Sequence, residues 1–495
     1  MHKYFNLFDL KQKVNYRTEV LSGLTVAMAL IPEAVAFALI AGLSPLTGLY
    51  AAFIMGIITA IFGGRPGMIS GATGAIAVVF FGLVTTLKEI NPSITVDEIT
   101  QYVFATVVLA GIIQILAGIL KLGKFMRLVP QPVIFGFVNG LAVIIFLSQL
   151  SQFTTDSTNP DAPWMSGSKL YTFTGLVIIA MIIIWGLPKI TKLVPAALTA
   201  ILAIFGLVYF FDIPTTTVGD IASIEGGFPP FNLPNIPLSM DTLQLIFPYA
   251  AIVAGVGLIE SLLTLNIIDE ITQTRGRGNK EAVAQGAANI LSGLLSGMGG
   301  CAMIGQSLIN ISSGARARLS GIVAAVMLLV FIMFGSSLIE KLPMAALTGL
   351  MIMVSIGTFE WASFRTFNRM PKSDVMVMLA VTLITVLLHN LALAVLLGVV
   401  IAALVFSWDN AKRIRARKHI DENGTKHYEI YGPLFFGSIA VFNEKFDIQG
   451  DPKKVIIDFA ESRVVDMSAI EALNKLTERY RDAGKNIHLK HLSRD

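Results

Sequence analysis

Residues 297–310, GMGGCAMIGQSLIN, interrupt a chain that is otherwise mostly apolar. The stretch contains four glycines and Cys301, the only cysteine in the chain. Glycine weakens a helix because it loses more conformational freedom on folding than any other residue. Within a membrane, a broken helix is tolerated only where its backbone is buried in protein or lines a water-filled cavity. If the neighbouring segments span a membrane, this stretch therefore predicts a broken helix at a functional site.

The composition is that of a membrane protein. Of 495 residues, 54% are hydrophobic and only 14% are charged, whereas a soluble domain carries about 25% charged residues. The polar N-terminus, MHKYFNLFDLKQKVNYRTEV, lacks the apolar core of a signal peptide and is expected to be cytosolic. A single cysteine excludes an internal disulfide and a cysteine-based metal cluster. We expect no metal or other cofactor, and the net charge of +4 gives no reason to expect a nucleic-acid partner.

Apolar runs long enough to cross a bilayer, roughly 17–25 residues for a full span, recur along the chain together with a few shorter ones. We expect fourteen membrane-spanning segments, at residues 20–40, 46–63, 68–87, 102–120, 129–150, 172–188, 194–211, 244–268, 281–296, 301–312, 319–335, 343–357, 373–389 and 391–408. An even number of spans places both termini on the same side of the membrane.

Charge in the loops predicts which side that is. Loops on the side of the N-terminus carry most of the loop lysines and arginines, among them Arg275 and Arg277, whereas the opposite loops hold only Lys88, Lys169 and Lys341. Cytoplasmic loops are enriched in Lys and Arg. We therefore predict a multi-pass protein of the inner (cytoplasmic) membrane with both termini in the cytoplasm.

The composition changes after residue 408. We predict a transmembrane domain over residues 1–408, a basic cytosolic linker over 409–426, and a short α/β domain over 427–495. In the last of these, KVIIDFA is typical of a buried strand, SAIEALNKLTERYRDAG of an amphipathic helix, and KNIHLKHL of another strand.

A second glycine-rich stretch, GMISGATGAIAVVF at residues 67–80, resembles the first. Each stretch follows a long apolar segment with one carboxylate, Glu33 in the first case and Glu260 in the second. Fourteen spans divide into two sets of seven, and an odd number of spans inverts the second set. The pattern predicts a 7+7 inverted repeat, an architecture that secondary transporters use, with the substrate between broken helices near the midplane.

Two helices that begin inside the membrane, near Thr73 and near Ala302 to Gln306, would direct unpaired N–H groups and the positive ends of their dipoles at one place. Such a place binds an anion without a fixed cationic side chain. Close helix packing is the alternative reading, since small residues are enriched at membrane helix contacts. A carboxylate inside a span is a functional hypothesis by default, and burial favours its protonated form. The alternative for Glu33 and Glu260 is that each caps a broken helix.

The chain resembles the SulP family of anion transporters over nearly its whole length. The resemblance is carried by AMALIPEAVAFALIAGLSPLTGLYAAF, GATGA, GLIESLLTLNIID and GCAMIGQSLIN followed by SSGARARLSG. The tail VIIDFAESRVVDMSAIEALNKL is similar to a STAS domain, including the turn at Asp466 and Ser468. The resemblance implies a core domain of spans 1–4 and 8–11, a gate domain of spans 5–7 and 12–14, and an anion between the starts of spans 3 and 10.

Individual residues follow from the resemblance. Expected substrate contacts come from the starts of spans 3 and 10 and from span 1: Thr73, Gly74, Ala302, Met303, Ile304, Gln306 and Phe37. Glu33 matches an acidic position linked to proton coupling, and Glu260 stands where sodium-coupled bicarbonate members carry an aspartate. Gln306 is neutral near the position at which animal members carry an arginine, and Ile304 replaces a threonine of sodium-coupled members. Protons are therefore expected as the coupling ion ahead of sodium.

The predicted function is secondary transport of a small anion, with sulfate as the family's default and with proton coupling or exchange. Bicarbonate transport, dicarboxylate transport and an anion channel on the same scaffold stay open as alternatives, as does a signalling scaffold that presents the STAS domain. An enzyme is not expected, because the sequence shows no metal-ligand cluster and no nucleophile–base pair. The resemblance also implies a homodimer, and Ser468 matches a serine that is phosphorylated in bacterial STAS regulators.

Overall fold

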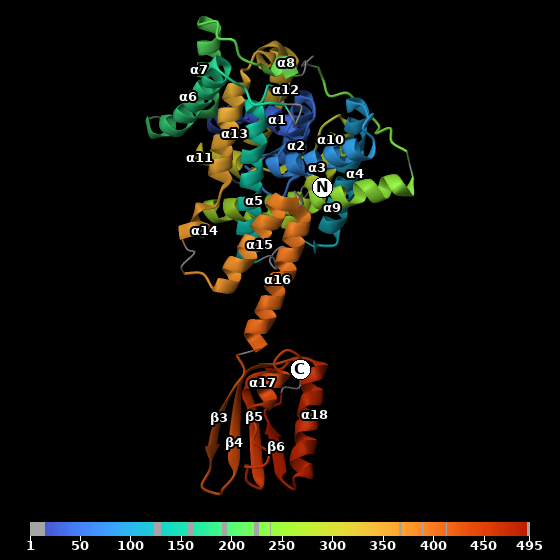
Figure 1. Cartoon of the computed structure of the whole chain (residues 1–495), viewed down its shortest axis with the longest axis vertical. Coiled ribbons are helices and arrows are strands. Elements are labelled where there is room, and N and C mark those ends of the chain that lie inside the picture. Colours follow the sequence, from blue (N-terminus) through green and yellow to red (C-terminus); the bar gives the residue numbers. More distant parts are fainter. Residues whose placement is uncertain are drawn as a thin grey trace. The chain divides into compact units, whose positions relative to one another are not determined.

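The structure is a computed structural model that describes residues 15–122, 130–155, 162–190, 196–221, 227–237, 239–365, 369–388, 391–411 and 413–492. The chain forms two compact units, one comprising residues 1–370 and 378–396 and the other residues 371–377 and 397–495. The first is almost wholly helical, and the second contains a four-stranded sheet (Figure 1).

The helices coincide with the predicted apolar segments. In the order of those segments they are α1 (Tyr16–Ile40), α2 (Pro45–Phe62), α3 (Gly74–Ile90), α4 (Val96–Ile119), α5 (Gln131–Leu150), α6 (Ser168–Ile190), α7 (Ala196–Phe210), α9 (Met240–Thr272), α10 (Gly278–Leu294), α11 (Ile304–Ser312), α12 (Leu319–Glu340), α13 (Met344–Thr358), α15 (Lys372–Leu388) and α16 (Leu391–Ala411). Short helices α8 (Val218–Ile221) and α14 (Trp361–Arg365) and the 3-10 turn η2 (Ser151–Phe153) lie between them. Within the described residues, seven helices are long and apolar enough to cross a membrane: α1, α2, α4, α5 with η2, α6, α9 and α12.

Two residue pairs form a small antiparallel ladder inside the helical unit. Strand β1 (Ser70–Gly71) precedes α3, and strand β2 (Cys301–Ala302) precedes α11. Ser70 lies opposite Ala302, and Gly71 lies opposite Cys301. All four residues are buried. The two glycine-rich stretches therefore meet in space, although more than two hundred residues separate them in the sequence.

Helices α4 and α10 pack closely beside this ladder. A Cβ atom placed on Gly111 of α4 would lie 2.5 Å from the carbonyl oxygen of Gly286, and one on Gly286 of α10 would lie 2.6 Å from that of Gly111. Small residues at membrane helix contacts let backbones approach in this way. The close approach brings polar side chains of α4 and α10 within hydrogen-bonding distance of each other.

The second unit has a sheet in the order β3-β4-β5-β6, formed by β3 (Arg415–Ile420), β4 (Lys426–Leu434), β5 (Lys454–Val464) and β6 (Asn486–Lys490). Strand β3 is antiparallel to β4, and the other neighbours are parallel. Helices α17 (Ile439–Asn443) and α18 (Met467–Asp482) pack on one face, where Phe442 and Leu473 join a core with Tyr428 and Ile457.

Part of the expected linker belongs to this sheet. Residues 415–420 pair with β4 in a regular antiparallel register, from Arg415 opposite Tyr431 to Ile420 opposite Lys426. The basic composition of the segment concealed the strand, because most of its side chains are exposed on the edge of the sheet. Ser468 is exposed in the first turn of α18, where Asp466 caps the helix by accepting a hydrogen bond from the N–H of Ala469 at 2.8 Å.

Candidate functional site

The crossing of β1 and β2 defines the site. It depends on Gly300, the residue just before β2, because a Cβ atom there would lie 2.0 Å from the carbonyl oxygen of Gly71. Any other residue would push the two strands apart. Each of the two antiparallel strands is followed within two residues by a helix, so α3 and α11 both begin at the crossing.

Both helix starts keep backbone donors without an intrahelical acceptor. The N-cap residues Thr73 and Met303 make no side-chain capping bond. The first intrahelical bonds are donated by the N–H groups of Ala77 and Ser307, to the carbonyls of Thr73 and Met303. By helix geometry, the three N–H groups before each of these have no partner within the helix. They belong to residues 74–76 of α3 and 304–306 of α11, and with the helix dipoles they favour a negative charge.

The backbone donors at Ala302 and Met303 are already used. The Ala302 N–H donates to the Ser261 hydroxyl at 3.1 Å, and the Met303 N–H donates to the Ile69 carbonyl at 2.9 Å. The resemblance implied backbone contacts at Ala302, Met303 and Ile304 in span 10. Of these, only Ile304 lies in the first turn of α11, where its N–H has no partner within the helix. Gly305 and Gln306 complete that turn.

The space beside this turn is open at Gly305. The residue is exposed, and a Cβ atom placed on it would have no heavy atom within 4 Å other than those of its own turn. The start of α3 is more crowded, because a Cβ atom on Gly74 would lie 2.9 Å from both Phe37 and Ile145. An approaching molecule therefore has more room at the start of α11 than at the start of α3.

The two intramembrane carboxylates lie beside the two helix starts. Glu33 accepts a hydrogen bond from the side-chain amide of Gln306, so α1 and α11 are joined at this point. Glu260 accepts a hydrogen bond from the Cys301 thiol at 3.0 Å, and the same sulfur lies 3.2 Å from the Thr73 hydroxyl. Cys301 therefore connects Glu260 on α9 with the residue that precedes α3, a role that the sequence did not reveal.

A row of buried polar side chains on α10 also escaped the sequence analysis. Glu281 binds the loop after α2, and the other three bind the backbone or a side chain of a glycine-rich stretch. Glu281 accepts from the N–H of Gly64 at 2.6 Å, Gln285 donates to the Ser70 hydroxyl at 2.8 Å, and Ser292 accepts from the N–H of Gly299 at 3.1 Å. Asn289, the fourth member, binds Gly300. The signal was present as polar residues spaced four, four and three apart along one face of an apolar helix.

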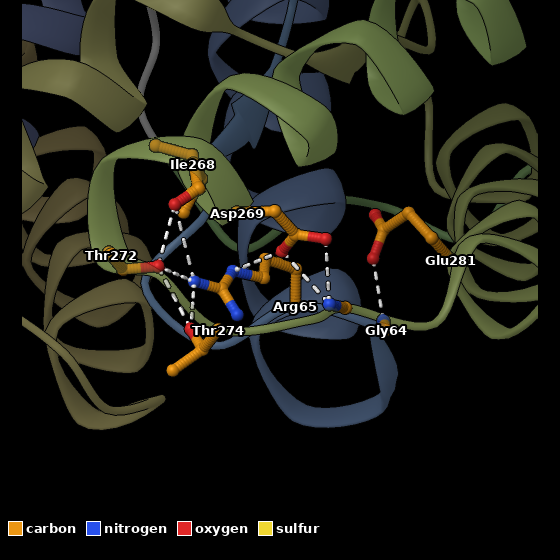
Figure 2. A network of polar contacts seen from close by, with 8 residues as sticks. Gly64, Arg65, Ile268, Asp269, Thr272, Thr274 and Glu281 are labelled. Carbon is orange, nitrogen blue, oxygen red and sulfur yellow. Dashed lines mark hydrogen bonds and ion pairs between the residues drawn. The ribbon is translucent and has the colours of Figure 1, made fainter.

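A second polar network ties the end of α9 to the loop after α2 (Figure 2). The Arg65 guanidinium lies 3.2 Å from an Asp269 carboxylate oxygen and donates to the hydroxyls of Thr272 and Thr274. Asp269 in turn accepts from the N–H of Gly276. The Arg65 side chain is only 7% exposed. Because α9 also carries Glu260 and Ser261, this network helps to fix the helix that lines the site.

Comparison with known proteins identifies the family. Residues 16–381 match the sulfate permease family, and residues 417–495 match the STAS domain. The chain belongs to the sulfate permease family. The resemblance in the sequence is thereby confirmed, and because this is a family of transporters, the chain is a multi-pass membrane transport protein rather than an enzyme. Across the described residues, no group of three or more His, Cys, Asp or Glu side chains is arranged to hold a metal ion.

Relatives in the family carry two kinds of name. A Bacillus subtilis (strain 168) protein named "Putative sulfate transporter YbaR" is 41% identical over 491 residues, which cover 99% of this chain and 98% of that protein. The "Bicarbonate transporter BicA" of Picosynechococcus sp. is 29% identical over 507 residues, covering 96% of this chain and 88% of that protein.

Solved structures agree with the fold. The transmembrane domain of a cyanobacterial bicarbonate transporter BicA superimposes with a TM-score of 0.66 at 29% identity, over 79% of this chain and 98% of that chain. The structure of SLC26A9 gives a TM-score of 0.80 over 98% of this chain and 86% of that chain. At 18% identity, the second likeness concerns the fold alone.

Proposed function

We propose that this protein is a secondary active transporter of a small inorganic anion, which binds between the N-terminal ends of α3 and α11. The observation that carries the proposal is the β1–β2 crossing, from which two helices begin with three backbone donors each that have no partner within their own helix. Six N–H groups and two helix dipoles form a cradle for an anion without a cationic side chain. Thr73, Gly74, Phe37 and Gln306 line or border the cradle, together with the first turn of α11 from Met303.

The proposed architecture is a 7+7 inverted repeat with α1–α7 in the first repeat and α9–α16 in the second. In this arrangement, spans 1–4 and 8–11 form the core domain that carries the cradle, and spans 5–7 and 12–14 form the gate domain. Support comes from the helix found at each of the fourteen predicted segments and from the antiparallel meeting of the two glycine-rich stretches. We place both termini in the cytoplasm, the transmembrane domain over residues 1–408, and the STAS domain after a short basic connection.

Coupling to protons is proposed to depend on Glu33 and Glu260. An ionised carboxylate beside the cradle repels an anion, whereas a protonated one does not. Within the described residues, Glu33 accepts a hydrogen bond from Gln306 and Glu260 accepts one from Cys301, and both of these donors are neutral. Uptake is therefore expected to rise as the external pH falls. Sodium coupling is the less favoured alternative, because Ile304 stands where the threonine of sodium-coupled members is found.

Sulfate is the proposed substrate, and bicarbonate is the second candidate. The relative that matches at 41% identity is named for sulfate, but relatives at 29% and 28% identity are named for bicarbonate. A cradle of backbone donors suits either oxyanion, because both present several acceptor oxygens. We also propose a homodimer, as the family resemblance implies, which light scattering of the purified protein would test.

The test is uptake into proteoliposomes that contain the purified protein. Radiolabelled sulfate, bicarbonate and succinate are supplied separately, with and without an inward proton gradient, and with sodium present or absent. Saturable sulfate uptake that accumulates only with the proton gradient supports the proposal. Uptake that requires sodium at every pH contradicts proton coupling. Unitary currents in planar bilayers would show that the protein is an anion channel and not a transporter. Absence of saturable uptake of all three anions would reject the function.

A further inference from the structure

The Asn289 side chain binds both the backbone N–H and the backbone carbonyl of Gly300. Its amide oxygen accepts from the Gly300 N–H at 2.9 Å, and its amide nitrogen donates to the Gly300 carbonyl at 3.0 Å. Asn289 is fully buried in α10. A paired donor and acceptor of this kind is what a neighbouring β-strand would supply, so the side chain takes the place of a third strand beside the β1–β2 crossing.

The orientation of Asn289 is itself fixed by a residue of another helix. Its amide nitrogen also donates to the Gln114 side-chain oxygen at 2.8 Å, and the Gln114 amide donates to the Ala254 carbonyl at 3.4 Å. Gln114 is likewise fully buried. The series runs from α9 through α4 to α10 and ends on the backbone that precedes α11. Each amide is held in one orientation because the reverse orientation would oppose like groups.

We infer that Asn289, oriented by Gln114, is a positioning residue that sets the place of the α11 start in the anion cradle. This inference rests on the proposed function. Gly300 is followed at once by Cys301, which binds Glu260 and Thr73, and by Ala302, whose N–H is held by Ser261. A displacement of Gly300 therefore moves the donors of α11 and the partner of Glu260 together. Among the hydrogen bonds of the described residues, those of Asn289 go to Gly300 and Gln114 and not to the cradle donors or the carboxylates, so it acts through this backbone.

Substitution of Asn289 by Asp tests the inference with almost no change in volume. The new carboxylate oxygen would face the Gly300 carbonyl and the Gln114 oxygen, two acceptors that it repels when ionised. We expect the KM for anion uptake to rise tenfold or more in Asn289→Asp, with partial recovery at low pH, where a protonated Asp can again donate. Gln114→Met leaves Asn289 in place but removes its orienting partner, and it should give a smaller change in the same direction.

Asn139→Asp is the matched control. Asn139 is also a buried asparagine that binds both a backbone N–H, that of Glu360, and a side chain, that of Ser363. It lies on α5, and its hydrogen bonds within the described residues go to Glu360 and Ser363, outside the crossing. Asn139→Asp should keep the wild-type KM and the wild-type pH profile, because the loss of a buried amide alone does not displace Gly300.

A second readout does not depend on transport. Cys301 is the only cysteine of the chain and is fully buried, so its rate of modification by N-ethylmaleimide, followed by intact-protein mass, reports how well the crossing is held. We expect modification at least tenfold faster in Asn289→Asp than in wild type or Asn139→Asp, with monodisperse gel filtration in all three. Equal modification rates and equal KM values in Asn289→Asp and wild type would overturn the inference. If the proposed function is wrong, the wild-type protein should show no anion uptake, but Cys301 should still be modified faster in Asn289→Asp than in wild type.

Discussion

Gly305 offers the sharpest test of the anion cradle, because its replacement should separate folding from transport. Gly305 is the second residue of α11, and a Cβ atom there meets no neighbour within 4 Å. Alanine in place of glycine favours a helix by about 0.5–1 kcal/mol. Gly305→Ala should therefore unfold at the same temperature as wild type or slightly above it.

Transport by Gly305→Ala should nevertheless be impaired. The added methyl group enters the open space through which an anion would reach the N–H groups of the first turn. Loss of one hydrogen bond to a charged group costs roughly 1.5–3 kcal/mol, which corresponds to a rise in KM of roughly 10- to 150-fold at 1.4 kcal/mol per tenfold. Gly305→Leu, which fills more of the same space, should abolish saturable uptake while the protein stays folded.

Gly300→Ala is the contrasting variant. Its methyl group would lie 2.0 Å from the Gly71 carbonyl oxygen, so the β1–β2 crossing must open to admit it. Both the unfolding temperature and uptake should fall. The assays are thermal unfolding in detergent, followed by gel filtration, and the KM for sulfate uptake into proteoliposomes. A wild-type KM in Gly305→Ala, with uptake that is otherwise normal, would refute a cradle that includes the first turn of α11.

Three further predictions follow from the buried charges. Glu33→Gln and Glu260→Gln mimic permanently protonated side chains, so in each variant anion uptake should rise less as the pH falls. Exchange of anion for anion should survive. Wild-type pH dependence of uptake in both variants would contradict the coupling proposal. Arg65→Leu should lower stability by about 2 kcal/mol, because it takes the ion-pair partner from the partly buried Asp269 carboxylate. Thermal unfolding of Arg65→Leu/Asp269→Leu should recover part of that loss. In the STAS domain, burial opposes ionisation of Asp451, but hydrogen bonds from Lys426, Tyr480 and Tyr428 outweigh it and hold the pKa of Asp451 below its ordinary value. The stability from this group is therefore present at neutral pH and lost as the pH falls below about 4, and Asp451→Asn should speed amide hydrogen exchange in α18 at pH 7 far more than at pH 3.

The sequence predicted the helices because long apolar runs leave little choice of structure in a membrane. It also paired the two glycine-rich stretches as equivalent features, and the structure shows them in contact. It could not predict that Ser70 lies opposite Ala302, since strands of two residues carry no periodic pattern. Strand β3 was hidden for a related reason: an exposed edge strand with basic side chains resembles a linker.

Hydrogen bonds that reach across the fold were the other feature that the sequence concealed. A search for carboxylates and glycines found Glu33, Glu260 and the broken stretches, because those residue types are rare or costly inside a membrane. Asn289 and Gln285 are neutral amides, which are tolerated in membrane helices wherever a partner is available. Their partners, Gly300 and Ser70, become neighbours only when α10 packs against the crossing.

The supports of the two broken stretches are unequal, and this bears on how the proposed site works. The backbone of the crossing is nearly symmetric, with one strand and one helix start from each proposed repeat. Its polar supports come mainly from the second repeat: Gln285 binds Ser70 in the first stretch, Asn289 binds Gly300 in the second, and Ser307 of α11 accepts from the Ile69 N–H at 2.9 Å. Since one helix, α10, holds both stretches, the two helix starts should move together as one body rather than open apart. An anion bound between them would then be carried with the core domain, and access to it would have to change through movement of the surrounding helices.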